Sequence, residues 1–293
     1  MADKGNRTSK KKGSSHITAL GVPVVIACVV VALVAGVLVG RFALGGSSAG
    51  AAFSGKTTVA EADLDKPIAS FTYDGKTETV SVREAIESQV SLDSVKTDDG
   101  SYTMPSADEA LSVARNRILQ KVAADKGITV SDDELATYSE QMGYGSDFAS
   151  IAQKYQLTED QAKQVIRENA VMKKLMDGVV TTQAGTQPTP PDTPAEGTED
   201  QANATYGAYI VGLLGDEWDS ANNKWARTDG PYYAALSSET FSADSATYAQ
   251  AQKAYYVAYQ QYSTNSQSAN SEWKTYVNGI LSGASIELYT LGS

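Results

Sequence analysis

The chain has 293 residues, one cysteine, one histidine and a formal net charge of −11. Because the histidine is His16, the rest of the chain has no Ser–His nucleophile system and no histidine-bearing zinc site. After Arg41 the chain carries 18 basic and 34 acidic residues, and this acidity disfavours nucleic acid as a partner. No Walker-type or dinucleotide-binding glycine loop occurs either. We therefore expect a protein that is not an enzyme, with no catalytic residue, metal or cofactor.

The N-terminal region has the pattern of a membrane anchor. Residues 1–16 are basic, and 17–40 contain no charged residue. That run exceeds the ~20 residues that cross a bilayer core, and the basic flank places the N-terminus in the cytoplasm. We expect a single transmembrane helix over 17–44. Two alternatives stay open, which are cleavage near the small residues 49–52 and lipidation of Cys28, because Val-Ile-Ala-Cys resembles a lipobox.

A hairpin and a helix are expected next. Residues 45–62 are rich in Gly, Ala, Ser and Thr, which is typical of a flexible tether. Two candidate strands, residues 68–73 and 77–82, flank Asp74-Gly75, which is a strong signal for a tight β-hairpin. Ser81 and Glu84 then form a capping-box pattern that predicts a helix start. Residues 93–105 are expected to be a loop.

Three or four helices are expected between residues 106 and 178. Three more capping-box patterns precede apolar periodic runs, with Gly127, Gly143 and Gly145 as helix stops. The capping pairs are Ser106 with Glu109, Ser131 with Glu134 and Thr158 with Gln161.

This stretch resembles the chaperone domain of SurA-type periplasmic chaperones and PrsA-type foldases, which is related to the chaperone region of trigger factor. The resemblance is carried by two runs, RNRILQKVAADKGITVSDDELATYSEQ and DFASIAQKYQLTEDQAKQVIRENAVMKKL. It implies a mostly α fold with a small β-hairpin, and ATP-independent binding of unfolded polypeptides. The parvulin-type isomerase domain of PrsA-type proteins has recognisable histidine and glycine-rich motifs, and these are missing here.

The C-terminal third has an unusual composition. Residues 181–200 are rich in proline and are expected to be a linker that does not pack. Residues 201–293 then hold 11 of the 16 tyrosines and all three tryptophans. We expect short helices near 206–214 and 232–236, a helix over 243–262, a possible break at 263–271, and a final helix and strand. The last helix should return Trp273, Tyr276 and Ile280 to the helices of residues 82–178, so that both halves form one domain.

The tyrosines of the 243–262 helix have two interpretations. At helical spacing they are first of all a buried core face. The alternative is a peptide-binding surface, because tyrosine combines an apolar body with a polar tip. Flexible methionines also suit promiscuous grooves. The candidate peptide-binding residues are Met142, Tyr144, Met172, Met176, Tyr255, Tyr256 and Tyr259.

The sequence thus favours a bacterial, single-pass cell-membrane protein whose bulk is extracytoplasmic and binds unfolded or newly exported polypeptides. Two alternatives stay open, namely a surface scaffold for one folded partner and a prolyl isomerase with a degenerate domain at 183–242. Clients and oligomeric state are not predicted. The expected parts are a basic tail at 1–16, a transmembrane helix at 17–44, a tether at 45–62, a SurA-like helical domain at 63–180, a proline-rich linker at 181–200 and a tyrosine- and tryptophan-rich segment at 201–293.

Overall fold

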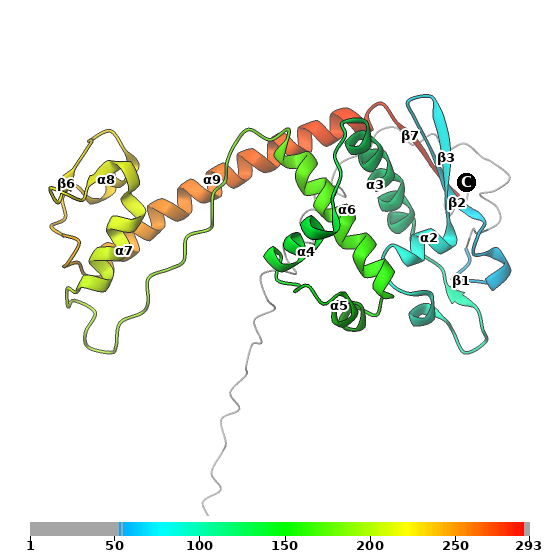
Figure 1. Cartoon of the computed structure of the whole chain (residues 1–293), viewed down its shortest axis with the longest axis horizontal. Coiled ribbons are helices and arrows are strands. Elements are labelled where there is room, and N and C mark those ends of the chain that lie inside the picture. Colours follow the sequence, from blue (N-terminus) through cyan, green and yellow to red (C-terminus); the bar gives the residue numbers. More distant parts are fainter. Residues whose placement is uncertain (1–52, 54, 290–293) are drawn as a thin grey trace, which may run out of the picture.

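The computed structural model describes Phe53 and residues 55–289 (Figure 1). The fold is mostly helical with three small sheets, as the sequence predicted in outline. Two lobes lie at opposite ends of one long helix, α9. The predicted transmembrane helix at 17–44 lies outside the described residues. Within the part of the chain that is described, no helix is long and apolar enough to cross a membrane.

The helices of the larger lobe begin where their capping boxes predicted. At each start the Ser or Thr hydroxyl accepts from the N3 amide, and the N3 side chain accepts from the cap amide. Four predicted boxes are confirmed in this way. The helices of this lobe are α2 (Val82–Glu87), α3 (Ala107–Asp125), α4 (Asp132–Gln141), α5 (Phe148–Tyr155) and α6 (Glu159–Asp177).

The predicted hairpin is present and gains a third strand. Strands β2 (Pro67–Tyr73) and β3 (Lys76–Ser81) are joined through Asp74 and Gly75, whose φ angles are 50° and 69°. Positive φ at both positions is what a two-residue hairpin turn requires. Strand β7 (Ser285–Leu288), from the far end of the chain, pairs antiparallel with β2 and gives the order β3-β2-β7.

Part of the expected tether belongs to the larger lobe instead. Strand β1 (Thr58–Val59) pairs with β4 (Tyr102–Thr103), which lies in the stretch expected to be a loop. Val59 and Phe53 are both buried because their apolar side chains complete the core beneath this sheet. Two short 3₁₀ helices, η2 (Glu61–Asp63) and η3 (Leu92–Val95), complete this end of the lobe.

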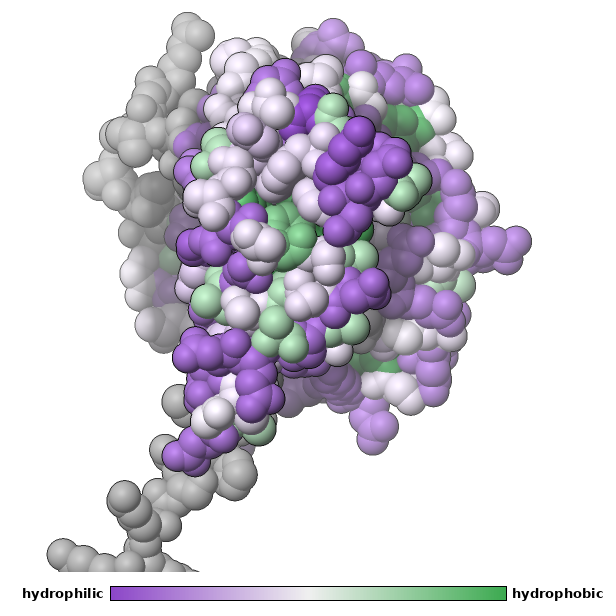
Figure 2. All heavy atoms as spheres, turned by 90° about the vertical axis from the view of Figure 1, so that its left-hand side faces the viewer, coloured by the Kyte–Doolittle hydropathy of each residue, from purple (hydrophilic) through white to green (hydrophobic). Residues whose placement is uncertain are grey.

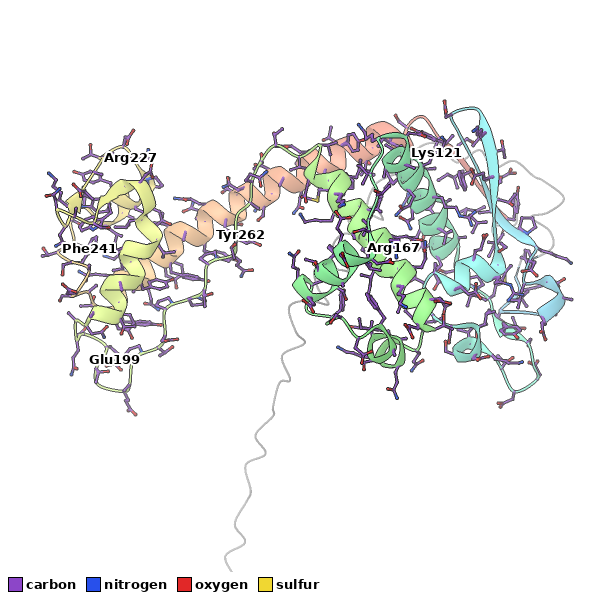
Figure 3. The ribbon with its side chains drawn as sticks, viewed as in Figure 1. Lys121, Arg167, Glu199, Arg227, Phe241 and Tyr262 are labelled. Atoms are coloured by element: carbon purple, nitrogen blue, oxygen red, sulfur yellow. The ribbon has the colours of Figure 1, made fainter. Side chains whose placement is uncertain are left out.

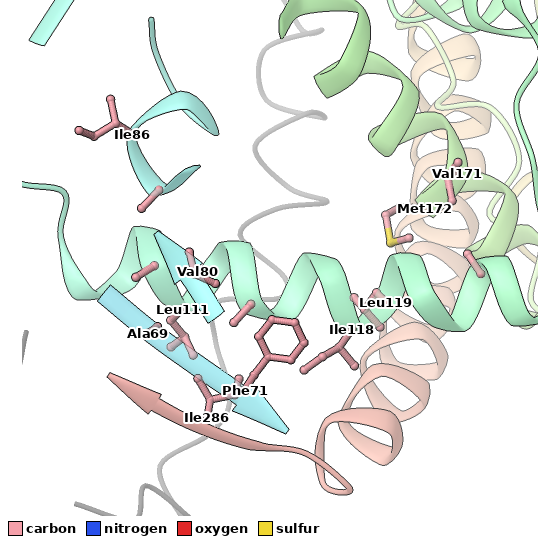
Figure 4. Close-up of a cluster of buried hydrophobic side chains, with 14 of the residues drawn as sticks. Ala69, Phe71, Val80, Ile86, Leu111, Ile118, Leu119, Val171, Met172 and Ile286 are labelled. Atoms are coloured by element: carbon pink, nitrogen blue, oxygen red, sulfur yellow. The ribbon is translucent and has the colours of Figure 1, made fainter. Parts of the chain in front are cut away.

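The core of the larger lobe lies between α3, α6 and the three-stranded sheet. Figure 4 shows Phe71 of the sheet close to Ile118 of α3, with Ile286 beside Phe71. The C-terminal end of α9 adds Trp273, which is 2% exposed and stacks on Tyr276 with 5.8 Å between ring centroids. The return packing expected for this helix is therefore present.

The smaller lobe, residues 203–258, has a hydrophobic core of its own. Tyr206, Ile210, Trp218 and Leu236 pack there against the N-terminal part of α9. A buried carboxylate, Glu217, accepts from the amides at the start of α8 in place of a capping side chain. The elements of this lobe are α7 (Ala204–Leu214), η4 (Gly215–Glu217), β5 (Trp218–Asp219), β6 (Lys224–Trp225) and α8 (Pro231–Leu236).

Helix α9 (Tyr248–Leu281) is one unbroken helix of 34 residues. At 1.5 Å per residue it is about 51 Å long. The break considered at 263–271 is absent, because that polar run contains neither Gly nor Pro and both ends of the helix are held by packing. This helix therefore sets the spacing of the two lobes.

Candidate functional site

Four tyrosines form a ladder on α9 that begins at the smaller lobe and continues onto the stretch between the lobes. The ring centroids of Tyr255 and Tyr256 are 5.6 Å apart, those of Tyr255 and Tyr259 are 5.9 Å apart, and those of Tyr259 and Tyr262 are 6.5 Å apart. Figure 3 shows Tyr262 on this connecting stretch. We call these four residues the tyrosine ladder.

The ladder reaches solvent because neither core covers it. Tyr256 is 63% exposed and Tyr259 is 43% exposed, and they are the exposed large hydrophobic side chains among the described residues. Tyr255 and Tyr262 are half-buried. The interpretation of this helix's tyrosines as a core face is therefore wrong for Tyr259, whereas Tyr248 does pack on the smaller core.

The surroundings of the ladder are electrically neutral. Between Lys253 and Glu272 the helix carries no charged residue, although the protein as a whole is acidic. Lys253 is paired with Glu239, and Glu272 is engaged with the proline-rich linker. A neutral aromatic stripe favours contact with apolar side chains and peptide backbone over contact with ions.

The ladder continues toward α7 through Tyr209. Burial raises the pKa of Tyr209 to about 12, with further contributions from Tyr255 and Tyr232. The hydroxyl of Tyr209 donates to the carbonyl oxygen of Thr189 at 2.7 Å. The proline-rich linker was expected not to pack, but it lies against α7 and its Pro191 is buried.

Figure 2, which faces the smaller lobe, shows a mainly hydrophilic or neutral outer surface with a few apolar side chains in its middle.

The methionine part of the candidate set lies elsewhere. Met172 is 6% exposed and belongs to the core of the larger lobe (Figure 4). Met142 and Met176 are half-buried at the α4 and α6 side of the same lobe. Tyr144 packs edge-on against Tyr155 at 6.1 Å. The seven candidates thus form two separate groups, and only the tyrosines of α9 make an exposed surface.

Acidic residues at the start of α4 have a structural role. Asp132 binds Arg167 at 2.8 Å, and Glu134 binds Lys174 at 2.5 Å while completing its capping box. Arg167 also donates to the carbonyl of Val130 (Figure 3). These pairs fasten the start of α4 to α6. Across the described residues, no group of three or more His, Cys, Asp or Glu side chains could hold a metal ion.

The surface of the described part of the chain includes two shallow depressions. The first, of about 230 Å³, lies between the linker and α7. The second, of about 340 Å³, lies between η3 and the start of α6, and its Thr158 and Gln161 are already occupied in a capping box. Both are shallow, so neither resembles an enclosed small-molecule site.

Two residues near this surface, Tyr206 and Tyr209, were not among the residues that the sequence suggested for peptide binding. A usable signal existed, because Tyr206 and Tyr209 are spaced i, i+3 on one helix just after a proline-rich run. Comparisons of the chain with family models, with curated proteins and with solved structures found no match. The resemblance to SurA-type and PrsA-type proteins therefore stays an expectation.

Proposed function

We propose that this protein is a membrane-anchored, extracytoplasmic chaperone that holds unfolded or newly exported polypeptides without ATP. The observation that carries the proposal is the exposed tyrosine ladder, in which Tyr256 is 63% and Tyr259 is 43% exposed although both lobes have packed cores of their own. Exposed aromatic side chains in a row usually mark a place where another polypeptide binds.

The ladder suits weak and reversible binding. Covering about 50 Å² of apolar area on one ring is worth about 1 kcal/mol. Four rings then supply about 4 kcal/mol before the costs of ordering and association, so one client segment is held only weakly. A holding chaperone needs such short-lived contacts, and several along one client chain add up through avidity.

The anchor places this surface outside the membrane. The uncharged run 17–40 with its basic N-terminal flank supports a cytoplasmic N-terminus and an exported domain. The SurA-like pattern over 106–178 supports the same compartment. A domain tethered there would meet chains as they emerge from export, before they fold.

Light scattering tests the proposal directly. A fragment starting at Gly45 keeps every described residue and omits the expected span. We expect it to suppress the aggregation of a chemically unfolded model protein, equally with and without ATP. The suppression should depend weakly on salt, because apolar contacts rather than charges drive it.

Two outcomes would replace the proposal with its alternatives. A well-folded fragment that ignores several unfolded clients but captures one folded partner would make the protein a scaffold. Catalysed cis–trans isomerisation of a proline peptide would assign it prolyl isomerase activity.

A further inference from the structure

The proline-rich linker is seated on α7 in a regular way. Its central part, residues 188–194, reads Pro-Thr-Pro-Pro-Asp-Thr-Pro, and we call it the proline segment. Exposure along it repeats every third residue. Pro191 is buried and Pro188 and Pro194 are half-buried, whereas the four residues between them are exposed.

A repeat of three is the period of the polyproline II helix. The sequence itself favours this conformation, because proline fixes φ near −65° and also restricts the residue before it to extended backbone. Within the segment, every residue except Asp192 is either a proline or the residue before a proline. The segment is therefore preorganised, and little entropy is lost when it binds.

Two tyrosines of α7 hold the segment through its backbone. The hydroxyl of Tyr206 donates to the carbonyl oxygen of Asp192 at 2.9 Å, and the hydroxyl of Tyr209 donates to that of Thr189 at 2.7 Å. The two acceptors are three residues apart, so they lie on one face of a polyproline II helix. Aromatic rings with hydrogen-bond donors at their tips, set against a Pro-x-x-Pro run, form the common recognition mode for proline-rich peptides.

The proline segment fills the surface of α7 only in part, and its own backbone N–H groups do not hold it there. A depression of about 230 Å³ remains between the segment and Tyr206 and Tyr209. No backbone N–H between Gln183 and Thr193 donates a hydrogen bond to another described residue. The segment can therefore leave α7 without breaking any ladder or helix.

We infer that the Tyr206–Tyr209 face of α7 is a binding site for proline-rich polypeptide in the polyproline II conformation, which the chain's own proline segment occupies until a partner's proline-rich segment replaces it. The site does not depend on the proposed function, because its recognition rests on hydrogen bonds to an extended backbone rather than on apolar holding. It lies in the same lobe as the start of the tyrosine ladder, because Tyr209 of α7 and Val257 of α9 pack on the same core.

Peptide binding to the full chain in detergent or nanodiscs tests this inference. The probe is a fluorescent peptide of residues 186–195, and a second peptide with its prolines replaced by alanine is the control. An internal ligand on a short tether acts at an effective concentration on the order of millimolar. Wild-type protein should therefore bind the probe weakly, whereas the variant with Pro188, Pro191 and Pro194 all changed to Ser should bind it at least about tenfold more tightly.

The tyrosines are then tested in the released variant. Adding Tyr206→Phe and Tyr209→Phe keeps both rings but removes both hydroxyls, and should weaken probe binding by about tenfold or more. Tyr233→Phe is the matched control, because that ring packs on Trp225 in the same lobe, away from the segment. It should leave binding unchanged.

A second released form guards against misfolding of the first. Replacing residues 187–194 by a Gly-Ser run of equal length removes the polyproline II preference. The inference is overturned if either released form is folded by circular dichroism yet fails to bind the probe, or binds it equally well without the two hydroxyls. It is also overturned if wild-type protein binds as tightly as the released forms, or if the alanine peptide binds as well as the proline peptide.

Discussion

The carboxylate of Glu272 on α9 accepts a hydrogen bond from the backbone N–H of Thr181 at 2.6 Å, across 91 residues of sequence. Its second oxygen accepts from the hydroxyl of Thr182. One side chain thus fastens the start of the proline-rich linker to the helix that joins the lobes. The path of the linker is set at this end by Glu272 and at the other end by Tyr206 and Tyr209.

This contact should make stability depend on pH. The hydrogen bond from Thr182, followed by that from the Thr181 amide, lowers the pKa of Glu272 from 4.5 to about 2. Because the folded pKa lies below the unfolded one, the contribution is complete above about pH 4.5 and is lost as the pH falls toward 2. Glu272→Gln should lower the urea midpoint at pH 7, and the difference from wild type should shrink below about pH 3.

The control for that series is Glu196→Gln, because Glu196 is exposed on the same linker. It should leave the midpoint unchanged at every pH. A Glu272→Gln variant as stable as wild type at pH 7 would show that the contact contributes nothing.

Two glycines of α7 should respond in opposite ways to alanine. A Cβ on Gly207 would lie 2.5 Å from the carbonyl oxygens of Ser242 and Ala243, whereas one on Gly212 would meet nothing within 4 Å. We expect Gly207→Ala to destabilise the smaller lobe by about 1–3 kcal/mol. Gly212→Ala should instead stabilise it by up to about 1 kcal/mol through helix propensity. Thermal unfolding followed by tryptophan fluorescence measures both, and equal effects would contradict the close packing at Gly207.

The larger lobe should depend strongly on Trp273. Truncating this buried indole to alanine should cost about 3–5 kcal/mol. Trp273→Phe should cost less, because the indole N–H is buried without an acceptor among the described residues, so its loss removes no hydrogen bond. Urea denaturation should show the loss in the unfolding of the larger lobe. The smaller lobe has its own core and should keep its midpoint, and a parallel fall of both would show that the two cores unfold together.

Removing the exposed tyrosines should change binding rather than folding. Tyr256→Ser with Tyr259→Ser truncates two side chains that neither core covers, so circular dichroism and the melting temperature should stay close to wild type. Suppression of client aggregation should fall, because the ladder loses its two most accessible rings. Gln260→Ser, at an exposed position of the same helix, is the control and should keep full activity. If the double variant unfolded, Tyr256 and Tyr259 would be core residues rather than binding residues.

The membrane topology can be tested in intact cells. Protease added outside should remove the described domain and spare the basic tail of residues 1–16, since the uncharged run orients the chain with its N-terminus inside. Immunoblotting with an N-terminal tag measures this. Recovery of mature protein starting near Ala52, or lipidated at Cys28, would contradict an uncleaved anchor.

Local features of this protein were readable from its sequence. Capping boxes such as Ser131 with Glu134 act within four residues, and the Asp74-Gly75 turn needs only positive φ at two neighbouring positions. The sequence therefore determined where the helices of the larger lobe start, where the hairpin turns, and that the fold is mostly helical.

The arrangement of those pieces was decided only by the tertiary structure. Whether a tyrosine of α9 is covered depends on which core its part of the helix reaches, and helical spacing is the same for covered and exposed positions. The continuity of α9 through residues 263–271 likewise depends on packing at its two ends rather than on local propensity. Long-range contacts, such as the pairing of β7 with β2 and the hydrogen bond from Thr181 to Glu272, join segments that lie far apart in the sequence. Nothing in the local sequence of one segment predicts its partner. Which side chains are buried and which stay exposed is therefore a property of the whole fold.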